Sequence, residues 1–80
     1  MTTLPDKRAI LQPILDGIEP GWTIVKPSPL NPTDIESECI FQKGDKEART
    51  EIPSTYFRDA DQRHKIKPLV EDAIRNAKVK

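Results

Sequence analysis

Apolar residues near the N-terminus recur every three or four positions, which is typical of one face of an amphipathic helix. The repeat predicts a helix from about Pro5 to Asp16, and its apolar members are Ile10, Leu11, Ile14, Leu15 and Ile18. Thr3 and Asp6 have the spacing of a helix-start capping box, and Gly17 is placed to end the helix in a left-handed conformation. Pro13 lacks the N–H that a helix interior uses, so we expect it to kink or split the helix.

The pattern changes to a period of two in the middle of the chain, which indicates β-strands. Trp22 to Lys26 is rich in β-branched and aromatic residues and predicts a first strand. Ile35 to Lys43 and Lys46 to Ile52 flank Gly44-Asp45, which suits a two-residue hairpin turn with glycine at a positive φ. With this turn, Phe41 faces Ala48. The face so formed, which we expect to point inward, carries Ser37, Cys39, Phe41, Ala48, Thr50 and Ile52.

The opposite face of the predicted hairpin is charged. It carries Glu36, Glu38, Ile40, Gln42, Glu47, Arg49 and Glu51. A slip of one residue would bury the glutamates, so the alternation specifies the register. Exposed glutamates solubilise a sheet and discourage edge pairing. They also suit a docking face for a basic partner, including the last helix of a neighbouring molecule.

Helical spacing returns near the C-terminus and predicts a helical segment from about Asp59 to Lys78. Its apolar members are Ile66, Leu69, Val70, Ala73, Ile74 and Ala77. Asp59 and Gln62 have the spacing to cap its start. Pro68 leaves two alternatives: a helix that bends there, or a short turn that ends near His64, with Pro68 in the first turn of the main helix.

These elements predict an α+β fold in one small domain, residues 1–80, with a Pro-rich loop at residues 27–34 between the first two strands. Two amphipathic helices and a sheet with one apolar face indicate two layers, a three-stranded antiparallel sheet with both helices on one face. We expect Trp22, Ile24, Tyr56 and Phe57 at the margins of the core. The pattern leaves open which hairpin strand pairs with the strand that begins at Trp22.

Composition narrows the functional class. The 80 residues carry 13 basic and 13 acidic side chains, and a net charge of zero argues against non-specific binding to polyanions. A run of about twenty apolar residues is lacking, so we expect no membrane span. A single cysteine excludes an internal disulfide, and we expect a cytoplasmic protein. We expect no metal and no cofactor, because the chain has one histidine and no glycine-rich phosphate loop.

Each residue type with potential for chemistry also has a structural interpretation, which we favour. Cys39 could be a nucleophile, but an inward position on a strand suits a small buried residue. His64, between Arg63 and Lys65, suits a surface position, and Asp59 and Asp61 suit a helix start. Pro29-Leu30-Asn31-Pro32 fits a bare PxxP pattern, but it has no flanking arginine and suits a stiff loop.

Charge is unevenly distributed along the chain, with a net of −3 over residues 1–42 and +3 over residues 58–80. The basic cluster before the last helix contains Arg58, Arg63, His64, Lys65 and Lys67. A basic helix start can bind phosphates, although Asp59 and Asp61 oppose this. The predicted element order is that of double-stranded-RNA-binding domains, but the dense lysine motif that opens the last helix of those domains is missing here.

Two functions follow as hypotheses. The first is a non-enzymatic protein-interaction or regulatory module that uses the charge-split surface, with Glu36, Glu38, Ile40, Glu47, Arg49 and Glu51 as its contact residues. Another protein is the expected partner, and self-association is a further option. The alternative is nucleic-acid binding through Arg58, Arg63, Lys65 and Lys67. A small enzyme would need a cleft that joins Cys39, Tyr56 or His64 with carboxylates.

Overall fold

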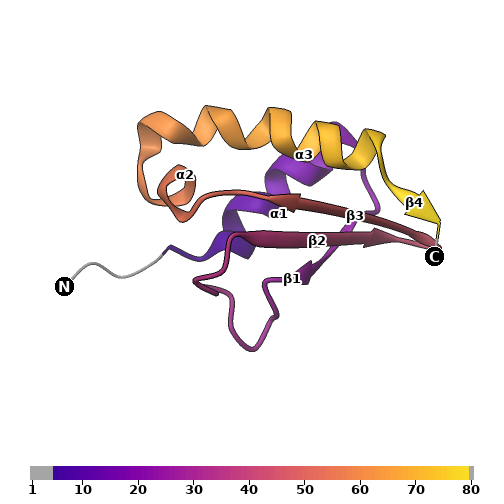
Figure 1. Ribbon diagram of the computed structural model, residues 1–80, viewed down its shortest axis with the longest axis horizontal. Coiled ribbons are helices and arrows are strands. Elements are labelled where there is room, and N and C mark those ends of the chain that lie inside the picture. The colour runs from indigo at the N-terminus through magenta and orange to yellow at the C-terminus, as the bar shows by residue number, and fades with distance from the viewer. Residues whose placement is uncertain (1–4, 80) are drawn as a thin grey trace.

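The computed structural model describes residues 5–79, which form an antiparallel sheet accompanied by helices (Figure 1). In chain order the elements are α1 (Lys7–Ile18), β1 (Thr23–Lys26), β2 (Glu38–Lys43), β3 (Lys46–Glu51), α2 (Ser54–Arg58), the 3-10 helix η1 (Ala60–Lys65), α3 (Ile66–Arg75) and β4 (Lys78–Val79). The strands lie side by side in the order β1-β2-β3-β4. The predicted α+β class is confirmed.

The sheet differs from the prediction at one edge. The chain continues past α3 and adds β4 beside β3, so the expectation of three strands was wrong. A two-residue strand is too short to show an alternation, and backbone pairing alone defines it. The open question of strand order is also answered, since β1 pairs with β2, the first strand of the hairpin.

The predicted hairpin register is confirmed. Cys39 pairs with Thr50 and Phe41 with Ala48, around a turn in which Gly44 has φ +57°. β2 begins at Glu38 rather than Ile35, because the Asp34 carboxylate accepts a hydrogen bond from the Glu36 N–H at 2.9 Å and holds the chain in a local turn.

The core lies between the inner face of the sheet and the helices, as expected. Its fully or almost fully buried members are Leu11, Leu15, Trp22, Ile24, Cys39, Phe41, Ala48, Ile52, Phe57, Ile66, Val70 and Ala73. α1 lies behind the sheet and α3 runs along β3 (Figure 1). Lys7 is also fully buried, which the polar start of α1 did not suggest.

The ends of α1 differ from the sequence prediction. Asp6 is the N-cap, and its carboxylate accepts a hydrogen bond from the Ala9 N–H at 3.2 Å; Thr3 lies outside the described residues. Gly17 lies inside the helix and does not end it, because the chain leaves α1 at Glu19 and turns at Gly21, with φ +101°. Pro13 also lies inside α1 and does not split it.

The last segment follows the second of the two alternatives. η1 ends at Lys65, and Pro68 is the third residue of α3, where its missing N–H has no helical acceptor to lose. Asp59 precedes η1 without a side-chain cap; its carbonyl oxygen accepts from the Gln62 N–H at 2.9 Å. Tyr56 and Phe57 belong to α2, an element too short for its periodicity to be recognised.

We expect two glycine substitutions to have effects of opposite sign. Gly17→Ala should stabilise the protein by about 0.5–1 kcal/mol, since alanine is the better helix residue and an added Cβ would meet nothing within 4 Å. Gly44→Ala should destabilise it by about 1–2 kcal/mol, because a side chain is strained at positive φ. Urea unfolding of both variants measures the change in the free energy of unfolding. A less stable Gly17→Ala protein would indicate that the helix ends at Gly17, as the sequence predicted.

Candidate interaction surface

The predicted contact residues on the strands share the outer face of the sheet, on the side away from the core. Glu38 pairs with Glu51 across β2 and β3, Ile40 pairs with Arg49, and the remaining carboxylate, Glu47, follows the same alternation. Glu36 lies in the loop just before β2. The structure therefore brings the six predicted residues together, with Glu36 at the rim of the face.

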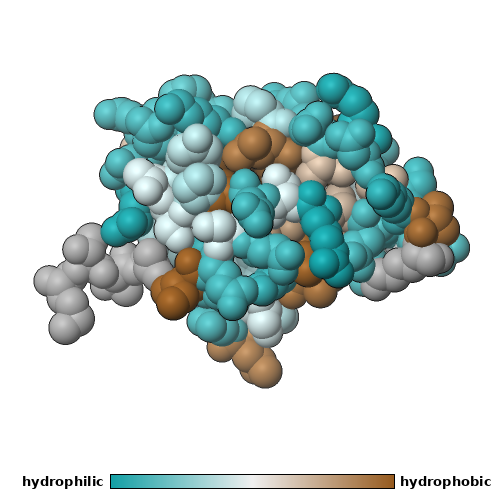
Figure 2. All heavy atoms as spheres, in the orientation of Figure 1, coloured by the Kyte–Doolittle hydropathy of each residue, from teal (hydrophilic) through white to brown (hydrophobic). Residues whose placement is uncertain are grey.

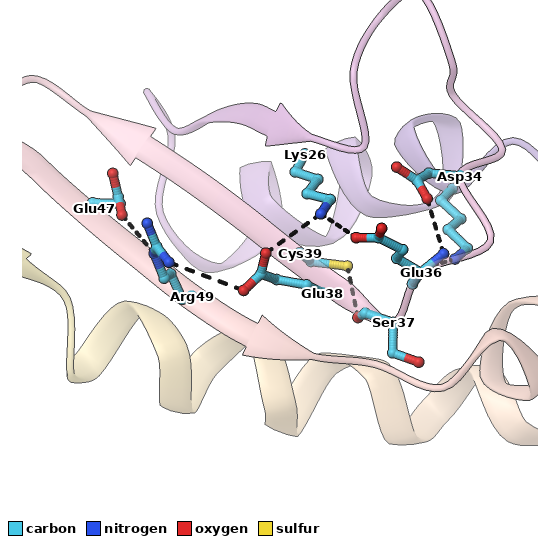
Figure 3. Close-up of polar contacts among 9 residues, drawn as sticks. Lys26, Asp34, Glu36, Ser37, Glu38, Cys39, Glu47 and Arg49 are labelled. Carbon is cyan, nitrogen blue, oxygen red and sulfur yellow. Dashed lines mark hydrogen bonds and ion pairs between the residues drawn. The ribbon is translucent and has the colours of Figure 1, made fainter.

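Ion pairs cross this face from β1 to β3 (Figure 3). The Lys26 ammonium contacts Glu36 and lies 3.4 Å from Glu38 Oε1. Arg49 Nε donates to Glu47 Oε1 at 2.7 Å, and an Arg49 terminal nitrogen lies 4.0 Å from Glu38 Oε2. Glu38 thus links the two cations. The hydrogen bonds that Lys26 donates to Glu36 and Arg49 donates to Glu47 raise the pKa of each cation.

Lys26 is a member of this face that sequence analysis missed. Its backbone pairs with Ile40, so its side chain adds a second cation to a face expected to hold one. The sequence pattern did not place Lys26 on this face, because the register between β1 and β2 shifts at a bulge between Ile24 and Lys26. Alternation counted along the strand fails where an extra residue enters the ladder.

Glu38 and Glu51 are direct cross-strand partners, and like charges in this position are locally unfavourable. Glu38 has two nearby cations, whereas Glu51 has no ion-pair partner among residues 5–79. The outer face can therefore accept a cationic group beside Glu51 without first breaking an internal ion pair.

The basic cluster lies along the segment from α2 to the start of α3. Arg58 ends α2, Arg63 and Lys65 lie in η1, and Lys67 lies in the first turn of α3. The Arg63 guanidinium donates to the Phe57 carbonyl oxygen at 3.1 and 3.0 Å, and Lys65 Nζ lies 5.6 Å from the centre of the Tyr56 ring. Two of the four predicted cations thus stabilise the corner between α2 and η1.

The start of α3 also differs from a free helix N-terminus. η1 leads directly into it, and the Ile66 N–H donates to the carbonyl oxygen of Arg63. This backbone donor is consequently occupied at the point where a phosphate would need it. Arg58, which precedes η1, and Lys67, which follows it, are exposed.

Cys39 is fully buried, and its Sγ lies 3.7 Å from the Ser37 carbonyl oxygen. Burial raises the pKa of its thiol to about 11. The interpretation of Cys39 as a small buried residue is confirmed. His64 lies on the exposed surface of η1, and within residues 5–79 His, Cys, Asp and Glu form no cluster of three that could hold a metal ion.

We expect the Cys39 thiol to resist labelling in the folded protein. At pH 8 a thiol-specific disulfide reagent should react slowly with the native chain and rapidly in denaturant, because the thiolate is the reactive form. Since the folded pKa is raised, the protonated thiol's contribution to stability is present below the ordinary thiol pKa and is lost as pH rises through about 11. Unfolding measured against pH should show this decline, and Cys39→Ala should lack it; rapid native labelling at pH 8 would contradict the assignment.

The loop between β1 and β2 is built from two consecutive turns. The Asn31 N–H donates to the Ser28 carbonyl oxygen at 2.9 Å, and the Asp34 N–H donates to the Asn31 carbonyl oxygen at 3.2 Å. Pro29 and Pro32 occupy the second positions of these turns, which proline favours. The PxxP segment is therefore turned, whereas the grooves that recognise PxxP take an extended polyproline II helix.

This loop presents two aliphatic side chains that sequence analysis did not select. Leu30 is 97% exposed and Ile35 is 78% exposed. In Figure 2, apolar side chains project at the lower left and bottom of the molecule, where Figure 1 draws this loop. The available signal was the pair of segments Ser28-Pro29-Leu30-Asn31 and Asn31-Pro32-Thr33-Asp34, each with the residue types of a β-turn.

The surface hollows among the described residues include the following two. One of about 410 Å³ lies at the hairpin turn and is lined by Glu19, Lys43, Gly44, Asp45, Lys46 and Val79. The other, of about 250 Å³, lies between the end of α3 and the sheet and is lined by Glu47, Arg49, Ala73, Asn76 and Lys78. Neither is lined by Cys39, Tyr56 or His64, any one of which the enzyme hypothesis would join with carboxylates in a cleft.

Within the part of the chain that the structure describes, no helix has the length and apolar character required to cross a membrane. Comparisons with family models, curated proteins and solved structures each found no significant match to this chain.

Proposed function

We propose that this chain is a non-enzymatic, cytoplasmic protein-interaction module whose contact surface is the outer face of the sheet and whose partner is a protein with a basic docking segment. The observation that carries the proposal is the pairing of Glu38 with Glu51 on the face of the sheet that carries none of the core residues. A cation supplied by a partner would relieve the local repulsion between these carboxylates.

The arrangement of charge supports this function over nucleic-acid binding. The outer face and the adjoining loop carry more carboxylates than cations, which repels phosphates. The basic cluster has the opposite sign, but Arg63 and Lys65 already make contacts within α2 and η1. Fewer of its cations are therefore free to bind a phosphate backbone than the sequence alone implies.

Two double variants with matched charge changes test the proposal. Glu38→Lys/Glu51→Lys reverses the outer face, and Lys65→Glu/Lys67→Glu reverses part of the basic cluster. After nuclease treatment, we expect the wild type and the second variant to retain the same protein from a lysate of the source cells. The first variant should lose it, and raising the salt concentration should weaken retention.

Circular dichroism controls for folding of each variant. Retention of the protein by the reversed face would contradict the proposed contact surface. A complex that is lost on nuclease treatment, or with Lys65→Glu/Lys67→Glu alone, would support the nucleic-acid alternative instead.

A further inference from the structure

We propose that the β1–β2 loop is a preformed docking element that inserts the Leu30 side chain into an apolar pocket of a protein partner, with lysine or arginine at the pocket rim. This inference rests on the proposed function. It adds Leu30 to the outer face as a second contact and states the chemistry of the partner's pocket that would bind it. The loop projects beyond the edge of the sheet (Figure 1).

Leu30 is 97% exposed, so folding gives its side chain almost no apolar contact. A single exposed leucine is ordinary on a protein surface. Here Ile35, 78% exposed, adds a second aliphatic side chain on the same loop. The free energy of transfer from water into an apolar pocket is more favourable for a leucine side chain than for any polar side chain in the loop.

The backbone around Leu30 is ordered before any partner binds. Two proline-containing turns set its course, and the Ser28 hydroxyl oxygen accepts from the Leu30 N–H at 3.2 Å. The loop is also attached to the core, since the Lys7 N–H donates to the Pro32 carbonyl oxygen at 3.1 Å and Lys7 Nζ donates to the Glu36 carbonyl oxygen at 2.9 Å. A loop held in this way loses little conformational entropy when it binds.

The side chains of the loop itself are acidic or neutral, since residues 27–37 contain Asp34 and Glu36 and no lysine or arginine. Lys26 contacts both Glu36 and Glu38 (Figure 3), whereas Asp34 in the loop and Glu51 on the outer face have no ion pair among residues 5–79. A receiving pocket with a cationic rim complements both the loop and the face, and a phosphate backbone complements neither.

A second copy of this chain is a poorer occupant. In the hollow at its hairpin turn, Glu19 and Asp45 lie beside Lys43 and Lys46, and Val79 is the one apolar side chain of the lining. The charges in that lining balance, whereas the loop calls for an apolar pocket with excess positive charge. We therefore favour a different protein and treat self-association as an outcome of the test.

Site-specific photo-crosslinking in the source cells tests the inference. A benzophenone amino acid replaces Leu30 in one full-length variant, Ile40 on the outer face in a second, and Gly17, an exposed position in α1, in a third. We expect one discrete protein adduct from position 30 and none from position 17. Mass spectrometry should map the partner peptide to an apolar pocket with neighbouring lysine or arginine.

Competition adds a quantitative readout. Excess wild-type chain should prevent the position-30 adduct, whereas Leu30→Asp should compete at least about tenfold less well. Val79→Asp makes the same change at another exposed aliphatic residue and should compete like the wild type. Leu30 is almost fully exposed, so Leu30→Asp should leave the unfolding curve unchanged.

The outcomes separate the two proposals. An adduct from position 40 with none from position 30 would overturn the role of the loop and leave the protein-interaction function standing. The absence of protein adducts from both positions would overturn both. An adduct of twice the mass of the chain, a nucleic-acid adduct, or equal competition by Leu30→Asp would each overturn the proposed insertion of Leu30 into another protein.

Discussion

Phe41→Ala should lower the free energy of unfolding by about 3–5 kcal/mol, a loss comparable to the whole stability expected of a domain this small. The Phe41 side chain lies on the inner face of β2, where its accessible surface is 0%, and the residue pairs with Ala48 in the middle of the sheet. Truncation removes apolar contacts and leaves a cavity that the helices and strands fill only partly.

Urea unfolding followed by Trp22 fluorescence measures this loss, with circular dichroism as a second probe. Ile40→Ala is the matched control, since Ile40 is the neighbouring residue on the same strand and faces outward. Its effect should be a fraction of that of Phe41→Ala. Equal losses in the two variants would mean that the inner and outer faces of β2 are assigned incorrectly.

Lys7→Glu should destabilise the protein by about 3–5 kcal/mol. Lys7 is fully buried, and its ammonium donates to the Glu36 carbonyl oxygen at 2.9 Å and to the Ser54 hydroxyl oxygen at 3.3 Å. It also lies 5.4 Å from the centre of the Phe57 ring. A carboxylate here would face acceptor oxygens and the negative face of a ring, and it would be removed from water.

Lys7→Met separates the charge from the packing of the side chain. It keeps the apolar stem and loses both hydrogen bonds, so we expect a smaller loss of about 1–3 kcal/mol. Lys26→Met removes a lysine from the exposed outer face and should change stability least of the three. Thermal unfolding orders the variants, and a Lys7→Glu protein as stable as Lys26→Met would contradict the buried position of Lys7.

Sequence analysis was sufficient for features that the residues of one short segment determine. The glycine at the hairpin turn and the alternation around Phe41 specify the register, because a slip would bury glutamates. The position of Pro68 in the first turn of α3 was one of two alternatives, and it is the one that costs no backbone hydrogen bond. The outer-face residues followed directly from the same alternation.

Where distant segments meet, sequence analysis failed for identifiable reasons. Gly17 was expected to end a helix, but α1 continues through it to Ile18, and the Glu19 N–H still donates to the Leu15 carbonyl oxygen. Lys7 has the position of a solvated residue at a helix start, yet the loop and α2 close over it and supply its acceptors. Lys26 joins the ion pairs only because a bulge shifts the register of β1.

The sequence by itself determined the periodic features of this protein: the apolar stripes of the helices, the hairpin with its register, and the division of the sheet into an apolar and a charged face. Tertiary structure decided the two-residue β4, the burial of Lys7 and the exposure of Leu30 on an ordered loop. The physical reason is the separation along the chain of the residues that interact. Periodicity reports which side of an element avoids water, whereas these three features depend on contacts between segments that lie far apart in the chain.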